Sequence, residues 1–184
     1  QLAWNTNSVS EALLVNTLNV RGAASASYQN STYKNELYPN LVNVAEGGVF
    51  SVSVYVEAMT KTGLGTIVAC EGSRFRTANI MEGTLKIPAN PGTFWAATMA
   101  NGTTLDISER TSAFDWGALL TIADGATVNV DVTGRSLQSG DVLLSWTTAP
   151  AGKFKLVGAP NYFAAKKTAT GLELFSSGIT IMIQ

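Results

Sequence analysis

Three short segments of this chain repeat one pattern, in which a glycine precedes a threonine, an aliphatic residue, a polar residue and a second aliphatic residue. The copies lie at 83–87, 102–107 and 125–130. A short strand that recurs at a step of about twenty residues is typical of solenoids, in which each repeat stacks on the next. The repeat therefore constrains the fold more than any other feature of the sequence.

Side chains in a strand alternate between its two faces, so each copy predicts aliphatic residues on one face and polar residues on the other. We expect the polar positions Lys86, Asp106 and Asn129 to form one outward ladder. Each aliphatic side chain that stacks inward contributes roughly 1.5–3 kcal/mol. The residues predicted to form aligned buried stacks are Leu85, Ile87, Leu105, Ile107, Val128 and Val130.

The other apolar segments are short and are separated by Gly, Pro or Asn turns, and none has the period of a long amphipathic helix. The sequence therefore predicts an all-β fold. Two architectures are compatible with it, a single-domain parallel β-helix (solenoid) and a β-sandwich or jelly roll. The repeat favours the β-helix. We expect one domain over residues 1–184, with an irregular cap and loop over 1–48 and regular rungs over 49–184.

The amino-acid composition excludes several classes of function. The chain has no histidine and a single cysteine, Cys70, which excludes Ser-His-Asp and Cys-His nucleophiles and structural zinc. The net charge is −1, with 12 basic and 13 acidic residues, so neither a nucleic acid nor a membrane is expected as a partner. Only 14% of the residues are charged and 17 are glycine, which favours an extracellular location, secreted or on the cell surface.

The C-terminal half resembles a known group of proteins. The segment from Leu119 to Gly134 (LLTIADGATVNVDVTG), followed by 141–146, 154–158 and 171–174, is similar to the closing rungs of secreted bacterial parallel β-helix proteins of the autotransporter-passenger type. The resemblance runs from residue 83 onward, and the N-terminal half departs from it. Among small domains, the chain resembles the β-helical carbohydrate-binding modules attached to xylanases. That resemblance implies xylan binding beside a covalently linked catalytic domain.

Aromatic residues near turns are the strongest indication of function, because sugar rings stack their C–H faces on exposed indole and phenol rings. Trp95 and Trp116 both lie in turn-rich segments, and Tyr55 alternates out of step with the valines around it, which predicts an outward ring. Tyr33 and Tyr38 belong to a polar segment with few aliphatic residues. These rings can also be buried packing residues, as tryptophan and tyrosine commonly are.

Charged residues form a second group of candidates. Lys86 and Asp106 are predicted to be neighbours on adjacent rungs, with Glu109, Arg110 and Asp115 in the following turn. Paired carboxyl groups carry out catalysis in glycosidases, whereas a solvated ladder of opposite charges contributes no more than about 1 kcal/mol. The sequence predicts no cofactor and no dedicated metal site, and it leaves open a structural calcium ion held by loop carbonyls.

The combined pattern favours a non-catalytic carbohydrate-binding module that recognises a plant cell-wall polysaccharide such as xylan through exposed aromatic and polar residues. No catalytic residue is assigned. Two alternatives are a structural or adhesive fragment of a bacterial surface protein, and a polysaccharide lyase or hydrolase that uses Asp106, Lys86 and Arg110. The residues expected to bind the ligand are Tyr55, Trp95, Trp116, Tyr33, Tyr38, Lys86 and Asp106.

Overall fold

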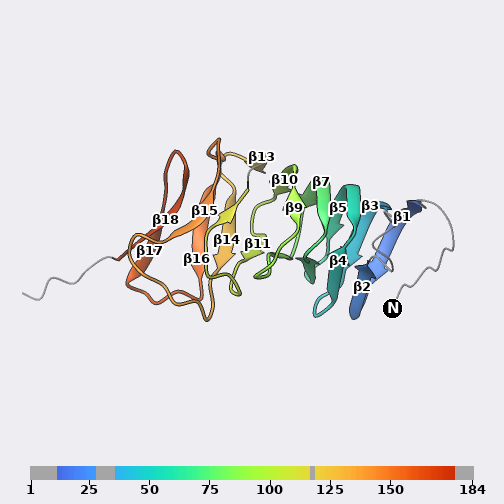
Figure 1. The fold of residues 1–184 in the computed structure, drawn as a ribbon, viewed down its shortest axis with the longest axis horizontal. Helices are drawn as coiled ribbons and strands as arrows, with labels where there is room; N and C mark the ends of the chain where they lie inside the picture. The colour runs from blue at the N-terminus through green and yellow to red at the C-terminus, as the bar shows by residue number, and fades with distance from the viewer. Residues whose placement is uncertain (1–11, 28–35, 117–118, 177–184) are drawn as a thin grey trace, which may run out of the picture.

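The computed structural model describes residues 12–27, 36–116 and 119–176. These residues form strands without a helix, and the strands build a parallel β-solenoid of about five turns. Successive strands cross the long axis of the molecule and follow one another from β1 at one end to β17 and β18 at the other (Figure 1). The predicted β-helix is therefore confirmed, and the β-sandwich alternative is wrong because neighbouring rungs pair in parallel.

Two parallel sheets form the main walls of the solenoid, and a smaller third sheet lies towards its C-terminal end. The first sheet contains β1 (Ala12–Val20), β3 (Glu36–Val44), β5 (Tyr55–Thr62), β7 (Arg74–Ile80), β10 (Ala96–Met99) and β13 (Leu119–Ile122), with β9 (Thr93–Phe94) also paired to β7. The second contains β2 (Ala23–Ser27), β4 (Val49–Ser53), β6 (Thr66–Ala69), β8 (Thr84–Lys86), β11 (Thr104–Asp106), β14 (Thr127–Asp131) and β16 (Lys153–Val157). The third contains β12 (Phe114–Asp115), β15 (Val142–Ser145), β18 (Gly171–Ser176) and β17 (Phe163–Lys167).

The core consists of aliphatic stacks that run along the solenoid. All six predicted aliphatic residues are buried, with no more than 1% of any side chain exposed. Leu85 lies opposite Leu105, and Leu105 lies opposite Val130. This register differs from the predicted outward ladder in one place, because Asp106 faces Asp131 rather than Asn129. A shift of two residues keeps the same face inward, so the repeated pattern alone cannot distinguish the two registers.

The glycine that begins each repeat turns the chain into a strand of the second sheet. Its backbone is left-handed in all three copies, with φ of 69° at Gly83, 79° at Gly102 and 77° at Gly125. Glycine adopts positive φ without the steric cost that a Cβ atom imposes. The turn at Gly83 is also crowded, because a Cβ there would lie 2.5 Å from the carbonyl oxygens of Gly63 and Gly65.

Regular rungs begin earlier in the chain than expected. β1 pairs with β3 in parallel, and β2 pairs with β4 in the same way. The expectation of an irregular cap over residues 1–48 is therefore wrong for these strands. The segment Ala23–Ser27 consists only of alanine and serine, so it carries no aliphatic periodicity. Its strand conformation comes from pairing with β4, which places Ala26 in the core at 3% exposed.

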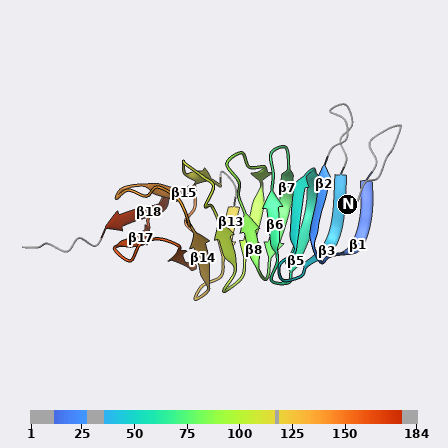
Figure 2. The same ribbon diagram turned by 90° about the horizontal axis from the view of Figure 1, so that it is seen from below.

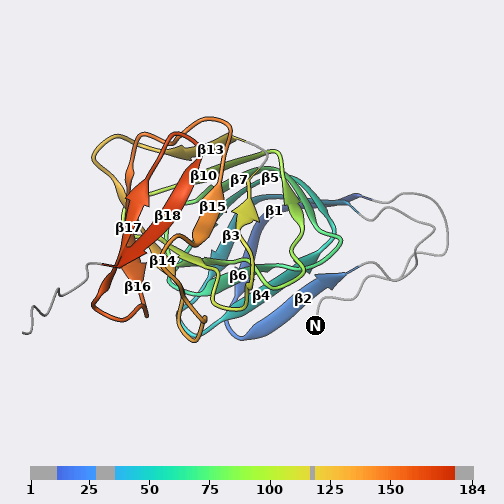
Figure 3. The same cartoon turned by 60° about the vertical axis from the view of Figure 1, so that its left-hand side comes forward.

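The parallel order ends at the C-terminal side of the described residues. β18 pairs antiparallel with β15, and β17 pairs antiparallel with β18. This hairpin lies beyond the last parallel rungs, as the two rotated views show (Figures 2 and 3). Lys167 on β17 joins the hairpin to the solenoid, since its Nζ donates to the carbonyl oxygens of Pro150, Ala151 and Gly152 at 2.8, 3.0 and 2.8 Å.

A lysine is buried at a turn between the first and second sheets. Lys61 on β5 is fully buried, and its Nζ donates to the carbonyl oxygens of Gly63 and Glu82. Burial lowers the pKa of Lys61 to about 8, although the carboxylate of Glu82 acts in the opposite direction. The buried ammonium group therefore obtains its hydrogen-bond partners from the backbone of two turns.

Candidate functional site

Aromatic side chains meet on the outer face of the first sheet, beside β5, β7 and β9. Tyr55 begins β5 and lies opposite Arg74 on β7, and Arg74 lies opposite Thr93 on β9. Trp95 follows β9 directly, and its ring meets that of Tyr55 edge-on, with the two centroids 6.3 Å apart. The parallel register thus brings together two of the residues predicted to bind the ligand.

Trp95 and Tyr55 differ in how far they are exposed. Trp95 is 56% exposed, as predicted. Tyr55 is half-buried, and its hydroxyl donates to the carboxylate of Glu57, which also pairs with Arg76. The hydrogen bond from Tyr55 is the largest cause that lowers the pKa of Glu57, and Arg76 lowers it further. Glu57 is thus held in its ionised form, and it fixes the phenol ring beside Trp95.

A hollow of about 460 Å³ adjoins Trp95, within the range typical of ligand sites. Its floor is aromatic and belongs to the core. Phe94 stacks on Phe75 with the ring centroids 4.8 Å apart, and Phe114 meets Trp116 at 5.1 Å. The residues that line the hollow are Arg74, Gly92, Thr93, Phe94, Trp95, Phe114, Asp115 and Trp116.

The prediction that Trp116 presents an exposed ring is wrong, because the side chain is only 2% exposed. Phe114 and Trp116 both point inward, and Asp115 between them points outward. This is the alternation that a strand imposes. Trp116 therefore belongs to the buried floor of the hollow and offers no stacking face on the outer surface.

The hollow is bordered by two charged residues, Arg74 and Asp115. Neither was predicted from the sequence to bind the ligand. Arg74 is exposed, and its guanidinium makes no hydrogen bond or ion pair with any other residue of the described ranges. Asp115 accepts a hydrogen bond from the hydroxyl of Ser145, at 3.1 Å. Arg74 has the same outward parity as its register partner Tyr55, and that parity was the signal in the sequence that could have identified it.

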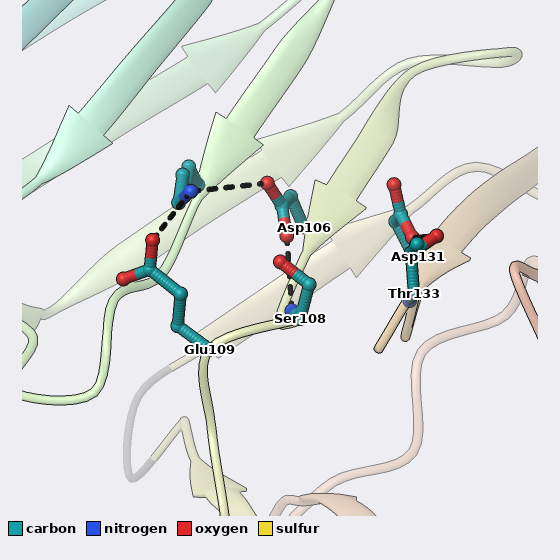
Figure 4. A network of polar contacts seen from close by, with 6 residues as sticks. Asp106, Ser108, Glu109, Asp131 and Thr133 are labelled. Carbon is teal, nitrogen blue, oxygen red and sulfur yellow. Dashed lines mark hydrogen bonds and ion pairs between the residues drawn. The ribbon is translucent and has the colours of Figure 1, made fainter. Parts of the chain in front are cut away.

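The predicted neighbours Lys86 and Asp106 do lie side by side, on β8 and β11. Lys86 Nζ is 2.7 Å from Glu109 Oε1 and 3.8 Å from Asp106 Oδ2 (Figure 4). The hydrogen bond to Glu109 is the largest cause that raises the pKa of Lys86. The lysine is therefore held as a cation between two carboxylates.

The carboxylates of Asp106 and Asp131 hold the turns that follow their strands (Figure 4). Asp106 Oδ1 accepts from the backbone N–H of Ser108 at 2.9 Å. Asp131 Oδ1 accepts from the backbone N–H of Thr133 at 2.8 Å and from its hydroxyl at 2.6 Å. An Asp carboxylate that accepts a hydrogen bond from the backbone N–H two residues later is typical of an Asx-turn. The geometry therefore accounts for both carboxylates as structural groups.

Arg110, the third residue of the hydrolase hypothesis, is engaged elsewhere. Its Nη1 donates to the carbonyl oxygens of Pro88 and Ala89, at 3.1 and 3.2 Å. Its Nη2 donates to the carbonyl oxygen of Ala113, and the guanidinium lies over the ring of Phe114. No ion pair joins Arg110 to Asp106 within the described part of the chain. Lys86 and Asp106 are therefore neighbours, whereas Arg110 is bound to the carbonyl groups of a separate turn.

These residues belong to a second internal repeat that sequence reasoning missed. The segments 106–110 (DISER) and 131–135 (DVTGR) share an Asp, an aliphatic residue, a Ser or Thr, and an Arg at equivalent positions. The turns match as well, because the N–H of Arg110 bonds to Ile107 and that of Arg135 bonds to Val132. Burial lowers the pKa of Arg135. The positive charge of Arg110 also lowers this pKa, whereas the negative charge of Asp141 raises it.

The remaining candidates are placed only in part. Tyr38 lies half-buried on β3, two residues after Glu36, the register partner of Tyr55. Tyr33 lies outside the described residues. Among the residues that the structure describes, no group of three or more acidic or cysteine side chains is arranged to hold a metal ion. The same residues include no helix that could cross a membrane.

Comparisons of this chain with protein-family models, with curated proteins and with solved structures find no match.

Proposed function

We propose that this domain binds a polysaccharide without cleaving it, at the surface formed by Trp95, Tyr55 and the adjoining hollow. The observation that carries the proposal is the exposed indole of Trp95 beside a hollow with an aromatic floor and two charged residues at its border. A concave, mostly apolar site with a few polar groups is typical of small-ligand recognition. An exposed indole also offers a flat apolar face to the C–H groups of a sugar ring.

The hollow has room for one sugar unit, and the exposed apolar surface beside it suits a longer chain. Leu119 is 57% exposed, and its N–H bonds to the carbonyl oxygen of Trp95, so the apolar surface continues from β9 towards β13. Residues in register on neighbouring parallel strands face the same way, so side chains of one kind can form a row along the solenoid. The ligand we propose is a plant cell-wall polysaccharide such as xylan, bound outside the cell by an accessory domain of a carbohydrate-active enzyme. That choice of polymer rests on the resemblance of the C-terminal half.

The two alternative functions have less support. A hydrolase needs Lys86, Asp106 and Arg110 at one reaction centre, and these side chains hold turns and each other instead. An adhesive solenoid fragment is expected to present matched parallel rungs at its ends. Within the described residues, β18 instead pairs antiparallel with β15 on the C-terminal side, whereas β1 and β2 are the outermost strands of the two parallel sheets on the other side.

Affinity electrophoresis and calorimetry against soluble polysaccharides test the proposal. Removing the ring in Trp95→Ala is expected to weaken binding at least about tenfold, because an exposed aromatic anchor supplies much of the contact energy in such a site. Tyr162→Ala is the matched control, since that ring is 57% exposed but lies just before β17.

The native fold of both variants is checked by circular dichroism. Equal affinity of wild type and Trp95→Ala would place the site elsewhere. Release of new reducing ends that Asp106→Asn abolishes would overturn the non-catalytic assignment and favour the enzyme.

A further inference from the structure

Two arginines on the same face of β7 have different surroundings. Arg76 pairs with the carboxylate of Glu57, so its charge is neutralised within the protein. Arg74, two residues earlier, lines the hollow beside Trp95 and makes no ion pair with any residue of the described ranges. Among the described residues, the Arg74 guanidinium at the border of the hollow thus has no acceptor, and it can donate to a bound ligand.

The planar fork of a guanidinium matches the two oxygens of a carboxylate, and such charge-assisted pairs are stronger than bonds to a neutral hydroxyl. Asp115 also borders the hollow and carries the opposite charge. Its carboxylate only accepts hydrogen bonds, so it suits a group that presents O–H donors. A ligand for this hollow therefore needs an acidic part, hydroxyl groups and an apolar face for Trp95.

A uronic acid ring has all three features. It carries a carboxylate on C5, hydroxyl groups on the opposite edge of the ring, and C–H groups on its faces. We propose that the hollow binds a uronate unit of an acidic polysaccharide, with the carboxylate on Arg74, ring hydroxyls on Asp115 and a ring face on Trp95. This assignment rests on the proposed function and specifies the class of sugar.

The experiment compares one polymer in two forms. Glucuronoxylan is measured by calorimetry before and after its carboxyl groups are reduced to primary alcohols. The wild-type domain is expected to bind the acidic form about tenfold more tightly, as a hydrogen bond to a charged group predicts. Added salt is expected to reduce the difference in affinity between the acidic and the reduced polymer, because salt screens exposed charges.

Variants then test whether Arg74 is responsible for the preference for the acidic polymer. Arg74→Gln is expected to bind both forms equally, and Arg74→Lys to retain only part of the preference, since lysine lacks the fork. Lys155→Gln on β16 removes one positive charge from the other parallel sheet and is expected to retain the full preference. Circular dichroism and thermal unfolding check that each variant is folded.

The outcomes separate this inference from the proposed function. Equal wild-type affinity for both forms, with binding still lost in Trp95→Ala, overturns the uronate assignment and leaves polysaccharide binding in place. A preference that survives in Arg74→Gln overturns the role of Arg74. Failure to bind either form, or any other polysaccharide tested, overturns both proposals.

Discussion

At the scale of single residues, strand parity decides which side chains reach solvent. Trp95 directly follows the buried Phe94 and therefore faces outward, whereas Trp116 lies two residues after the buried Phe114 and faces inward. Both tryptophans lie in turn-rich segments, so their setting alone did not distinguish them. The position of a ring relative to its nearest core residue is thus a better guide to exposure than the turn around it.

The same alternation predicts a sharp contrast between Leu105 and Asp106. Leu105 is 1% exposed and stacks between Leu85 and Val130, so Leu105→Ala is expected to lower the free energy of unfolding by about 2–5 kcal/mol. Asp106→Asn retains an oxygen that can accept from Ser108, and its contact with Lys86 is partly exposed, so a change below about 1 kcal/mol is expected. Denaturant unfolding of both variants checks the contrast, and similar small effects would mean that Leu105 does not belong to a core stack.

At the scale of elements, the three repeated strands of the second sheet, β8, β11 and β14, depend on the turns beside them. A left-handed glycine precedes β8, β11 and β14. Asp106 and Asp131, the last residues of β11 and β14, bond to the backbone two residues later. The strands themselves are short, and β8 and β11 have three residues each. The position of such a strand is therefore set by its turns as well as by its pairing.

Two of these glycines offer a matched comparison. Gly83→Ala and Gly102→Ala both place a Cβ on a backbone with positive φ, of 69° and 79°. At Gly102 the added atom meets nothing within 4 Å, so a cost of about 1–2 kcal/mol is expected from the backbone conformation alone. At Gly83 it also meets backbone oxygens at 2.5 Å, so the loss of stability is expected to be clearly larger. Denaturant unfolding measures both costs, and equal values would show that the turn at Gly83 relaxes freely.

At the scale of the whole molecule, the solenoid is a ladder in which each rung contacts mainly its neighbours. Strand pairing changes from parallel to antiparallel at β15, where the β17–β18 hairpin joins the third sheet. A parallel sheet that ends without a partner presents unpaired backbone groups, and pairing or covering them limits association with other chains. The contact of Lys167 with three carbonyl groups of residues 150–152 fixes the hairpin in this position.

Removing that contact is expected to loosen one end of the molecule only. In Lys167→Met, amide hydrogen exchange in β17 and β18 should accelerate by roughly tenfold, because the bonds to the carbonyl groups contribute about 1 kcal/mol or more. Exchange in β5 and β7 should not change, since rungs far apart do not touch. Lys166→Met is the control, because this neighbour is also exposed and makes no hydrogen bond to residues 150–152 within the described part of the chain. Acceleration throughout the chain would show that the hairpin supports the whole solenoid.

The sequence by itself determined the all-β class, favoured the solenoid and identified the aliphatic stacks of the three repeats, because alternation is a local property that neighbouring residues determine. Leu85, Leu105 and Val130 could be assigned to the interior from their own segments. Register was different, since a shift of two residues leaves every side chain on the same face, and only the packing of whole rungs selected Asp131 as the partner of Asp106. The candidate site depends on that packing too. Tyr55, Arg74 and Trp95 come from three successive rungs, so their meeting is a property of the stacked ladder that no single segment contains.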